Sequence, residues 1–140
     1  MLSKYFSRSE LECRGYQRGV GCCNGLPDDG MNAELMNKLD ALREAVQRPV
    51  YVTSGYRCPI HNSKVSYATL SFHTKGMAVD IYCDGMMVDE LADKAVDIGF
   101  RGVERNYDMD YVHVDVRPEQ YYFVHLNGAD RECDGRGNII

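Results

Sequence analysis

Residues 111–116 read YVHVDV and alternate between valine and polar or aromatic side chains. Because successive side chains of a β-strand point to opposite faces, this alternation predicts a strand with one apolar face. The three valines can pack in a core. The opposite face of the predicted strand carries Tyr111, His113 and Asp115.

Residues 77–82, MAVDIY, alternate in the same way, and Asp80 interrupts an apolar run. An ionised carboxylate among apolar neighbours is costly unless it is paired or bound to a metal. Two such strands side by side would place Asp80 and His113 on one surface. His73 lies seven positions before Asp80 in the loop SFHTKG, where Gly76 allows the chain to fold back tightly.

Two imidazoles and one carboxylate, with room for a water, form an open catalytic zinc arrangement. The spacing of the three residues is by itself a weak signal, because a single histidine is more often a surface or hydrogen-bonded residue than a ligand. On spacing alone both interpretations stay open. His61 and His125 match no such group, so the structural interpretation is preferred for both.

The rest of the chain mixes helices and strands. Helices are predicted near residues 32–47, with Asn32 as the N-cap and Pro49 as the stop, and over residues 88–98. Short strands are predicted at 50–53 and 121–125, and residues 62–70 fit either a short helix or a loop. Residues 1–30 look irregular, and residues 127–140 are polar and glycine-rich, typical of a mobile tail. We therefore expect a single domain over residues 1–140, of the α+β class, with a small, mainly antiparallel sheet and flanking helices.

The chain is acidic, with a formal net charge of -5 and a pI near 5.3. This charge argues against binding to nucleic acid and against electrostatic docking on an anionic membrane. The first ten residues, MLSKYFSRSE, contain no apolar stretch of signal-peptide length. Of the six cysteines, most are expected to be free or buried thiols, whereas Cys13, Cys22 and Cys23 leave open a bridge or a second metal site.

Three motifs follow one another in the order SGYR (54–57), S-x-H-x-x-G-x-A-x-D (71–80) and H-x-D (113–115). Together they resemble the zinc D-alanyl-D-alanine carboxypeptidase family, peptidase family M15. Within it they are most similar to the branch of bacterial carboxypeptidase domains and phage-type endolysins. The resemblance runs from about Leu2 to Arg117 and implies a fold like that of hedgehog domains and DD-peptidases.

The resemblance also implies roles for individual residues. It makes His73, Asp80 and His113 the ligands of one zinc ion, and Asp115 a group that orients a ligand histidine. It makes Asp110 the general base, with Asp108 as a second choice in the same NYDMD segment. It makes Arg57 and Ser71 substrate-binding residues. Arg57 would also complement negative charge in the transition state.

The implied activity is zinc-dependent hydrolysis of D-amino-acid-containing peptidoglycan stem peptides, by a D-Ala-D-Ala carboxypeptidase or an endolysin-type endopeptidase. The alternative is a non-catalytic zinc-binding or cell-wall-binding module of hedgehog-like fold. The expected partners are peptidoglycan peptides, acted on by a monomer. We expect the protein to be made in the cytoplasm without a signal peptide, unless a leader precedes this sequence. It would then act on the cell wall after release, as a phage or prophage lysis enzyme does.

Overall fold

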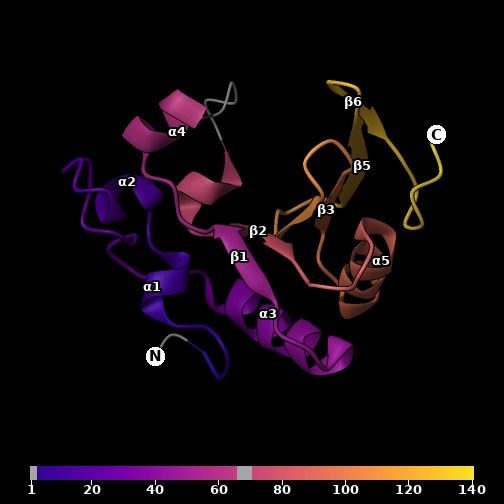
Figure 1. Cartoon of the computed structure of the whole chain (residues 1–140), viewed down its shortest axis with the longest axis horizontal. Coiled ribbons are helices and arrows are strands. Elements are labelled where there is room, and N and C mark those ends of the chain that lie inside the picture. Colours follow the sequence, from indigo (N-terminus) through magenta and orange to yellow (C-terminus); the bar gives the residue numbers. More distant parts are fainter. Residues whose placement is uncertain (1–2, 66–70) are drawn as a thin grey trace.

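A computed structural model of the chain describes residues 3–65 and 71–140 and contains an open sheet beside several helices (Figure 1). The sheet has the strand order β1-β2-β4-β3-β5-β6. Neighbouring strands are antiparallel except for the parallel pair of β3 and β5. The α+β class and the mainly antiparallel sheet are therefore confirmed. The strands are β1 (Tyr51–Ser54), β2 (Ala78–Tyr82), β3 (Gly102–Asn106), β4 (Tyr111–Asp115), β5 (Tyr121–Leu126) and β6 (Ala129–Glu132).

Two longer helices, α3 (Ala33–Val46) and α5 (Val88–Ile98), pack their apolar side chains against one face of this sheet. Figure 1 shows both helices on the same side of the strands, and α1 (Arg8–Leu11), α2 (Arg14–Gln17) and α4 (Pro59–Val65) grouped near β1. A 3-10 turn, η1 (Phe72–Lys75), leads into β2. Among the helices of the described residues, none combines the length and apolarity needed to cross a bilayer.

The predicted helix starts and alternating strands are largely confirmed. The Asn32 side chain accepts a hydrogen bond of 3.0 Å from the backbone N–H of Leu35, so it caps α3 as the sequence indicates. Segment 62–70 was predicted as either a short helix or a loop, and its first part is helical. Helix α4 begins earlier, at Pro59, and ends at Val65. Residues 66–70 lie outside the described part of the chain.

Strand β3 has no counterpart in the sequence prediction. Its sequence, GVERN, contains two adjacent charged residues and shows no apolar alternation. Pairing with β4 on one side and β5 on the other places β3 inside the sheet, with Arg105 buried. The tertiary neighbours, rather than the local pattern, make this segment a strand.

Residues 127–140 contain regular structure that the polar, glycine-rich sequence did not predict. Strand β6 pairs with β5. Beyond β6, Cys133 is buried, and its backbone forms an isolated antiparallel β-bridge with Ile139. The carbonyl of Gly135 accepts a hydrogen bond of 2.9 Å from Arg105. The polar composition gives no sign of these contacts, which are backbone pairing, the buried Cys133 and a hydrogen bond from the buried Arg105.

The Arg105 side chain anchors this region and gives a stability prediction. It is 1% exposed, and its guanidinium lies 2.9 Å from Asp89 Oδ1 and 2.7 Å from Asp93 Oδ1 on α5. We expect Arg105→Ala to lower the free energy of unfolding by about 3 kcal/mol, because a large buried side chain is lost together with its hydrogen bonds and a cavity forms. Urea unfolding followed by circular dichroism would measure the loss. The exposed Arg131→Ala serves as the matched control, and an equal loss in both variants would contradict the assignment.

Candidate metal centre

Three side chains converge on the sheet face opposite α3 and α5. Asp80 on β2 and His113 on β4 are direct partners in the strand register, so their side chains emerge side by side. His73 comes from η1, where Gly76 adopts a left-handed conformation (φ 68°) that turns the chain into β2. His73 Nε2 and His113 Nδ1 lie 3.2 Å and 3.0 Å from the same oxygen, Asp80 Oδ1. The structure thus brings together the three residues expected as metal ligands.

Hydrogen bonds on the far side of each ring fix the direction of the two imidazoles. His73 Nδ1 lies 2.8 Å from the carbonyl oxygen of Gly55, which can only accept, so this nitrogen carries the proton. His113 Nε2 lies 2.7 Å from Asp115 Oδ2 and donates to it. The opposite nitrogens, His73 Nε2 and His113 Nδ1, are therefore presented to the space beside Asp80. Such outer contacts are what orient metal-binding histidines in general.

Asp115 is itself held firmly. It is fully buried, ion-paired with Arg117, and accepts a hydrogen bond of 3.1 Å from the Arg117 backbone N–H. Its register partner is Gly102, where an added Cβ would lie 2.0 Å from Asp115 Oδ1. Glycine at this position of β3 therefore makes room for the carboxylate that orients His113.

The charges of this cluster favour a cation at its centre. Burial raises the pKa of Asp80, but the neighbouring His73 and His113 lower it further, so that the pKa lies well below its usual range. Burial lowers the pKa of His113, but Asp115 and Asp80 more than offset this and raise it to about 10. The cluster thus stabilises positive charge next to Asp80. Two imidazole nitrogens and one carboxylate within 4.8 Å of one another also fit the donor set and open geometry of a catalytic zinc site.

Arg57 and Ser71 adjoin the His73 side of the cluster. Arg57 Nη2 donates a hydrogen bond of 3.3 Å to Ser71 Oγ, and the same oxygen accepts one of 3.2 Å from the His73 backbone N–H. Arg57 Nε is buried and has no hydrogen-bond partner among the described residues. A partly buried cation with a free donor next to the candidate metal ligands can bind an anionic or carbonyl oxygen of a substrate.

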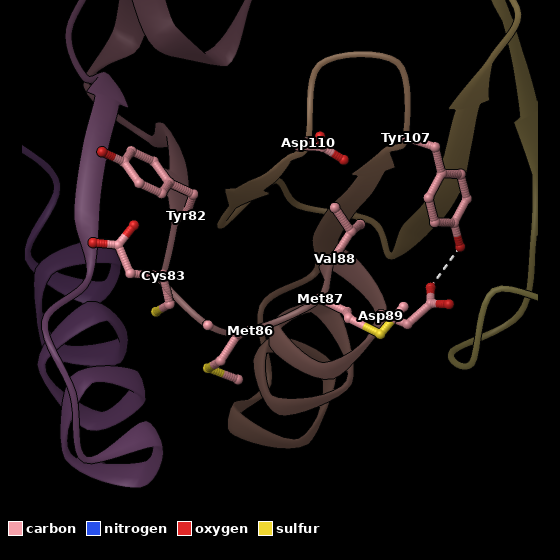
Figure 2. A pocket seen from close by; sticks show the side chains of 10 residues that line it. Tyr82, Cys83, Met86, Met87, Val88, Asp89, Tyr107 and Asp110 are labelled. Atoms are coloured by element: carbon pink, nitrogen blue, oxygen red, sulfur yellow. Dashed lines mark hydrogen bonds between the residues drawn. The ribbon is translucent and has the colours of Figure 1, made fainter.

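Asp110 lines a hollow whose lining includes none of the three candidate ligands. Asp110 occupies the turn before β4 with φ 57°, and its side chain lines a hollow of about 370 Å³ together with Met86, Met87 and Val88 at the start of α5 (Figure 2). Within residues 3–65 and 71–140 it makes no side-chain hydrogen bond with His113, Asp80 or His73. Its role as the base remains a prediction. Asp108, the second choice, accepts hydrogen bonds from the backbone N–H groups of Asn127 and Gly128, which is a turn-stabilising role.

Glu104 is a functional candidate that the sequence interpretation missed. It is the register partner of His113 on β3, so the two side chains lie on the same face of the sheet. Burial raises the pKa of Glu104, and its carboxylate interacts electrostatically with both His113 and Asp80. Tyr111 belongs to the same face, and burial together with Asp80 and Glu104 raises its pKa. The alternation of β4 already indicated Tyr111, whereas Glu104 could be found only once β3 was recognised as a strand.

His125 also has acidic neighbours. Its Nδ1 lies 2.6 Å from Asp130 Oδ1, its Nε2 lies 3.2 Å from Asp108 Oδ2, and Glu104 is close to both His125 and Asp130. Asp108 also contacts the turn between β5 and β6, through the backbone N–H groups of Asn127 and Gly128. Glu104, His125 and Asp130 form a group that could hold a metal ion, which the sequence interpretation of His125 did not include.

A mixed sheet that carries a buried His–Asp–His cluster on its open face, beside an arginine with a free donor, is the arrangement expected of a peptidase with an open metal site. A model of the family Peptidase M15 matches residues 4–115. The chain belongs to the peptidase M15 family. The matched region contains all three candidate ligands and ends at Asp115.

Curated relatives give a weaker but consistent match. The chain is 28% identical over 81 residues to proteins named peptidoglycan L,D-endopeptidase MepK, from Escherichia coli strain K12, Escherichia coli O157:H7 and Shigella flexneri. The alignment covers 54% of this chain and 44% of each relative. The chain therefore spans less than half the length of the curated relatives that it matches.

Proposed function

We propose that this protein is a zinc-dependent peptidase that hydrolyses peptidoglycan stem peptides. The observation that carries the proposal is the convergence of His73 Nε2, Asp80 Oδ1 and His113 Nδ1 on one point, with the rings oriented by Gly55 and Asp115. Family membership supports peptidase chemistry. The names of the curated relatives support a substrate from the cell wall.

Each side chain of this site has a separate role in the proposed hydrolysis of an amide bond. Zinc, when bound by the three ligands, polarises a carbonyl and lowers the pKa of a bound water to about 7. Arg57 binds substrate oxygen and complements the negative charge that develops there. A carboxylate accepts the proton of the attacking water and delivers it to the leaving nitrogen, for which Glu104 and Asp110 are the two candidates. Ser71 holds the Arg57 guanidinium in place.

We infer endopeptidase rather than D-Ala-D-Ala carboxypeptidase activity, because the curated relatives are named as L,D-endopeptidases. Arg57 is compatible with both, since its guanidinium can bind an internal carbonyl or a terminal carboxylate. Stem peptides contain both kinds of bond. Product masses therefore distinguish the two activities.

The test is digestion of purified, uncross-linked and cross-linked stem peptides by the zinc-loaded protein, with products identified by mass spectrometry. We expect a peptide cut at an internal bond, and loss of the product after treatment with a chelator. Release of terminal D-alanine alone would overturn the endopeptidase inference and keep the peptidase. Zinc-loaded protein that sediments with cell walls but yields no product would instead favour a wall-binding module.

A further inference from the structure

Four cysteines from distant parts of the sequence converge near β1. Cys13 precedes α2, the adjacent Cys22 and Cys23 follow it, and Cys58 precedes α4. All six cysteines of the chain are free thiols, and these four sulfurs lie within 4.8 Å of one another. The Sγ–Sγ distances are 3.9 Å for Cys13 and Cys58 and 3.9 Å for Cys22 and Cys23. The sequence pointed to the first three cysteines, but only the fold adds Cys58.

We propose that Cys13, Cys22, Cys23 and Cys58 bind a second zinc ion in a closed, structural tetrathiolate site. A tetrahedral site with Zn–S bonds of about 2.3 Å separates its sulfurs by about 3.8 Å, close to both observed pairs. A disulfide requires about 2.05 Å, so bridging would need the sulfurs to move together by nearly 2 Å. Binding releases the thiol protons to solvent and leaves four thiolates on the ion.

The backbone around the sulfurs fits this role. The N–H of His61 donates to Cys58 Sγ and the N–H of Gly25 donates to Cys23 Sγ, each at 3.4 Å. Gly25 has φ 97°, a conformation that other residues rarely adopt. At Gly15 an added Cβ would lie 2.9 Å from Cys22 Sγ, so the backbone of α2 packs directly against the cluster. Backbone amides directed at sulfur stabilise thiolates.

Two basic side chains lie beside the cluster and offset part of its charge. Four thiolates and one divalent ion carry a net charge of about −2. Arg18 and Lys64 line the same hollow of about 140 Å³ as Cys22. These cations make a dianionic site less costly at this place than it would be among the acidic residues that dominate the chain.

The proposed site would fasten the N-terminal segment to the loop after β1. The Tyr56 N–H donates a hydrogen bond of 2.9 Å to the Leu11 carbonyl, and Cys58 ends the same loop. The loop contains Gly55, whose carbonyl orients His73, and Arg57. The second zinc is therefore structural, with all four positions taken by protein, and the inference stands whether or not the proposed peptidase activity is correct.

The test is a zinc-to-protein ratio measured on the purified full chain by mass spectrometry of the metal. We expect two ions per chain in the wild type and one in His113→Ala. The paired variant Cys22→Ser/Cys23→Ser is expected to lose one ion and keep the ion at His113. The matched controls Cys83→Ala and Cys133→Ala alter buried thiols outside the cluster and should keep two ions.

A spectroscopic readout covers the case in which the paired variant fails to fold. We expect His113→Ala loaded with Co²⁺ to show the intense near-ultraviolet charge-transfer absorption of a cobalt tetrathiolate. Loss of all bound metal in His113→Ala, or a Co²⁺ spectrum without thiolate bands, would overturn the second site. A disulfide mapped between any two of Cys13, Cys22, Cys23 and Cys58 in the unfolded, metal-free protein would do the same.

Discussion

His113→Ala is expected to abolish turnover of stem peptides, with a decrease in kcat/KM of at least about 10³-fold. His113 supplies one of three converging donors, and its ring is fixed between Asp80 and Asp115 at 3.0 Å and 2.7 Å. Removing the ring deletes one of the three donors and leaves Asp80 and Asp115 without their shared partner, so metal affinity falls as well. A metal ion contributes several kcal/mol to hydrolysis, which corresponds to a loss of about this size.

The measurement combines steady-state kinetics with the metal content of the same preparation. His61→Ala is the matched control, because it removes an imidazole that contacts none of the three ligands. Asp115→Asn provides an intermediate step: it keeps the ring in place but weakens its orientation, and a decrease of about 10–100-fold is expected. Full activity of metal-free His113→Ala would show that hydrolysis does not depend on this site.

The sequence was sufficient for the parts of this site that follow from local pattern. Alternation in residues 77–82 and 111–116 put Asp80 and His113 on polar faces, and the register of β2 with β4 then made them direct partners. His73 followed from the glycine turn and from the resemblance to known peptidases. These predictions succeeded because both strands have one apolar face, which fixes their register.

The remainder depends on contacts that no local pattern encodes. Glu104 lies in a strand with charged neighbours, and its proximity to His113 arises from pairing between β3 and β4. Cys58 joins Cys13 across 45 positions because β1 returns the chain beside α2. Asp110 was chosen by its spacing from His113, but it lies in a turn with φ 57° and lines the hollow at the start of α5. Spacing along a strand predicts a face, whereas spacing across a turn does not.

Glu104→Gln is expected to lower kcat by about 10²–10⁴-fold while leaving the zinc content unchanged, the range typical for loss of a general base. Glu104 shares its sheet face and register position with His113, whereas Asp110 lies in the hollow beside Met86 and Met87. Glutamine keeps the length of the side chain and the hydrogen-bonding position that Asn106 Nδ2 contacts at 3.0 Å, but it cannot accept a proton.

The comparison is Asp110→Asn, for which we expect less than about a tenfold decrease in kcat. The opposite pattern, with turnover lost in Asp110→Asn and retained in Glu104→Gln, would show that Asp110 rather than Glu104 is the general base.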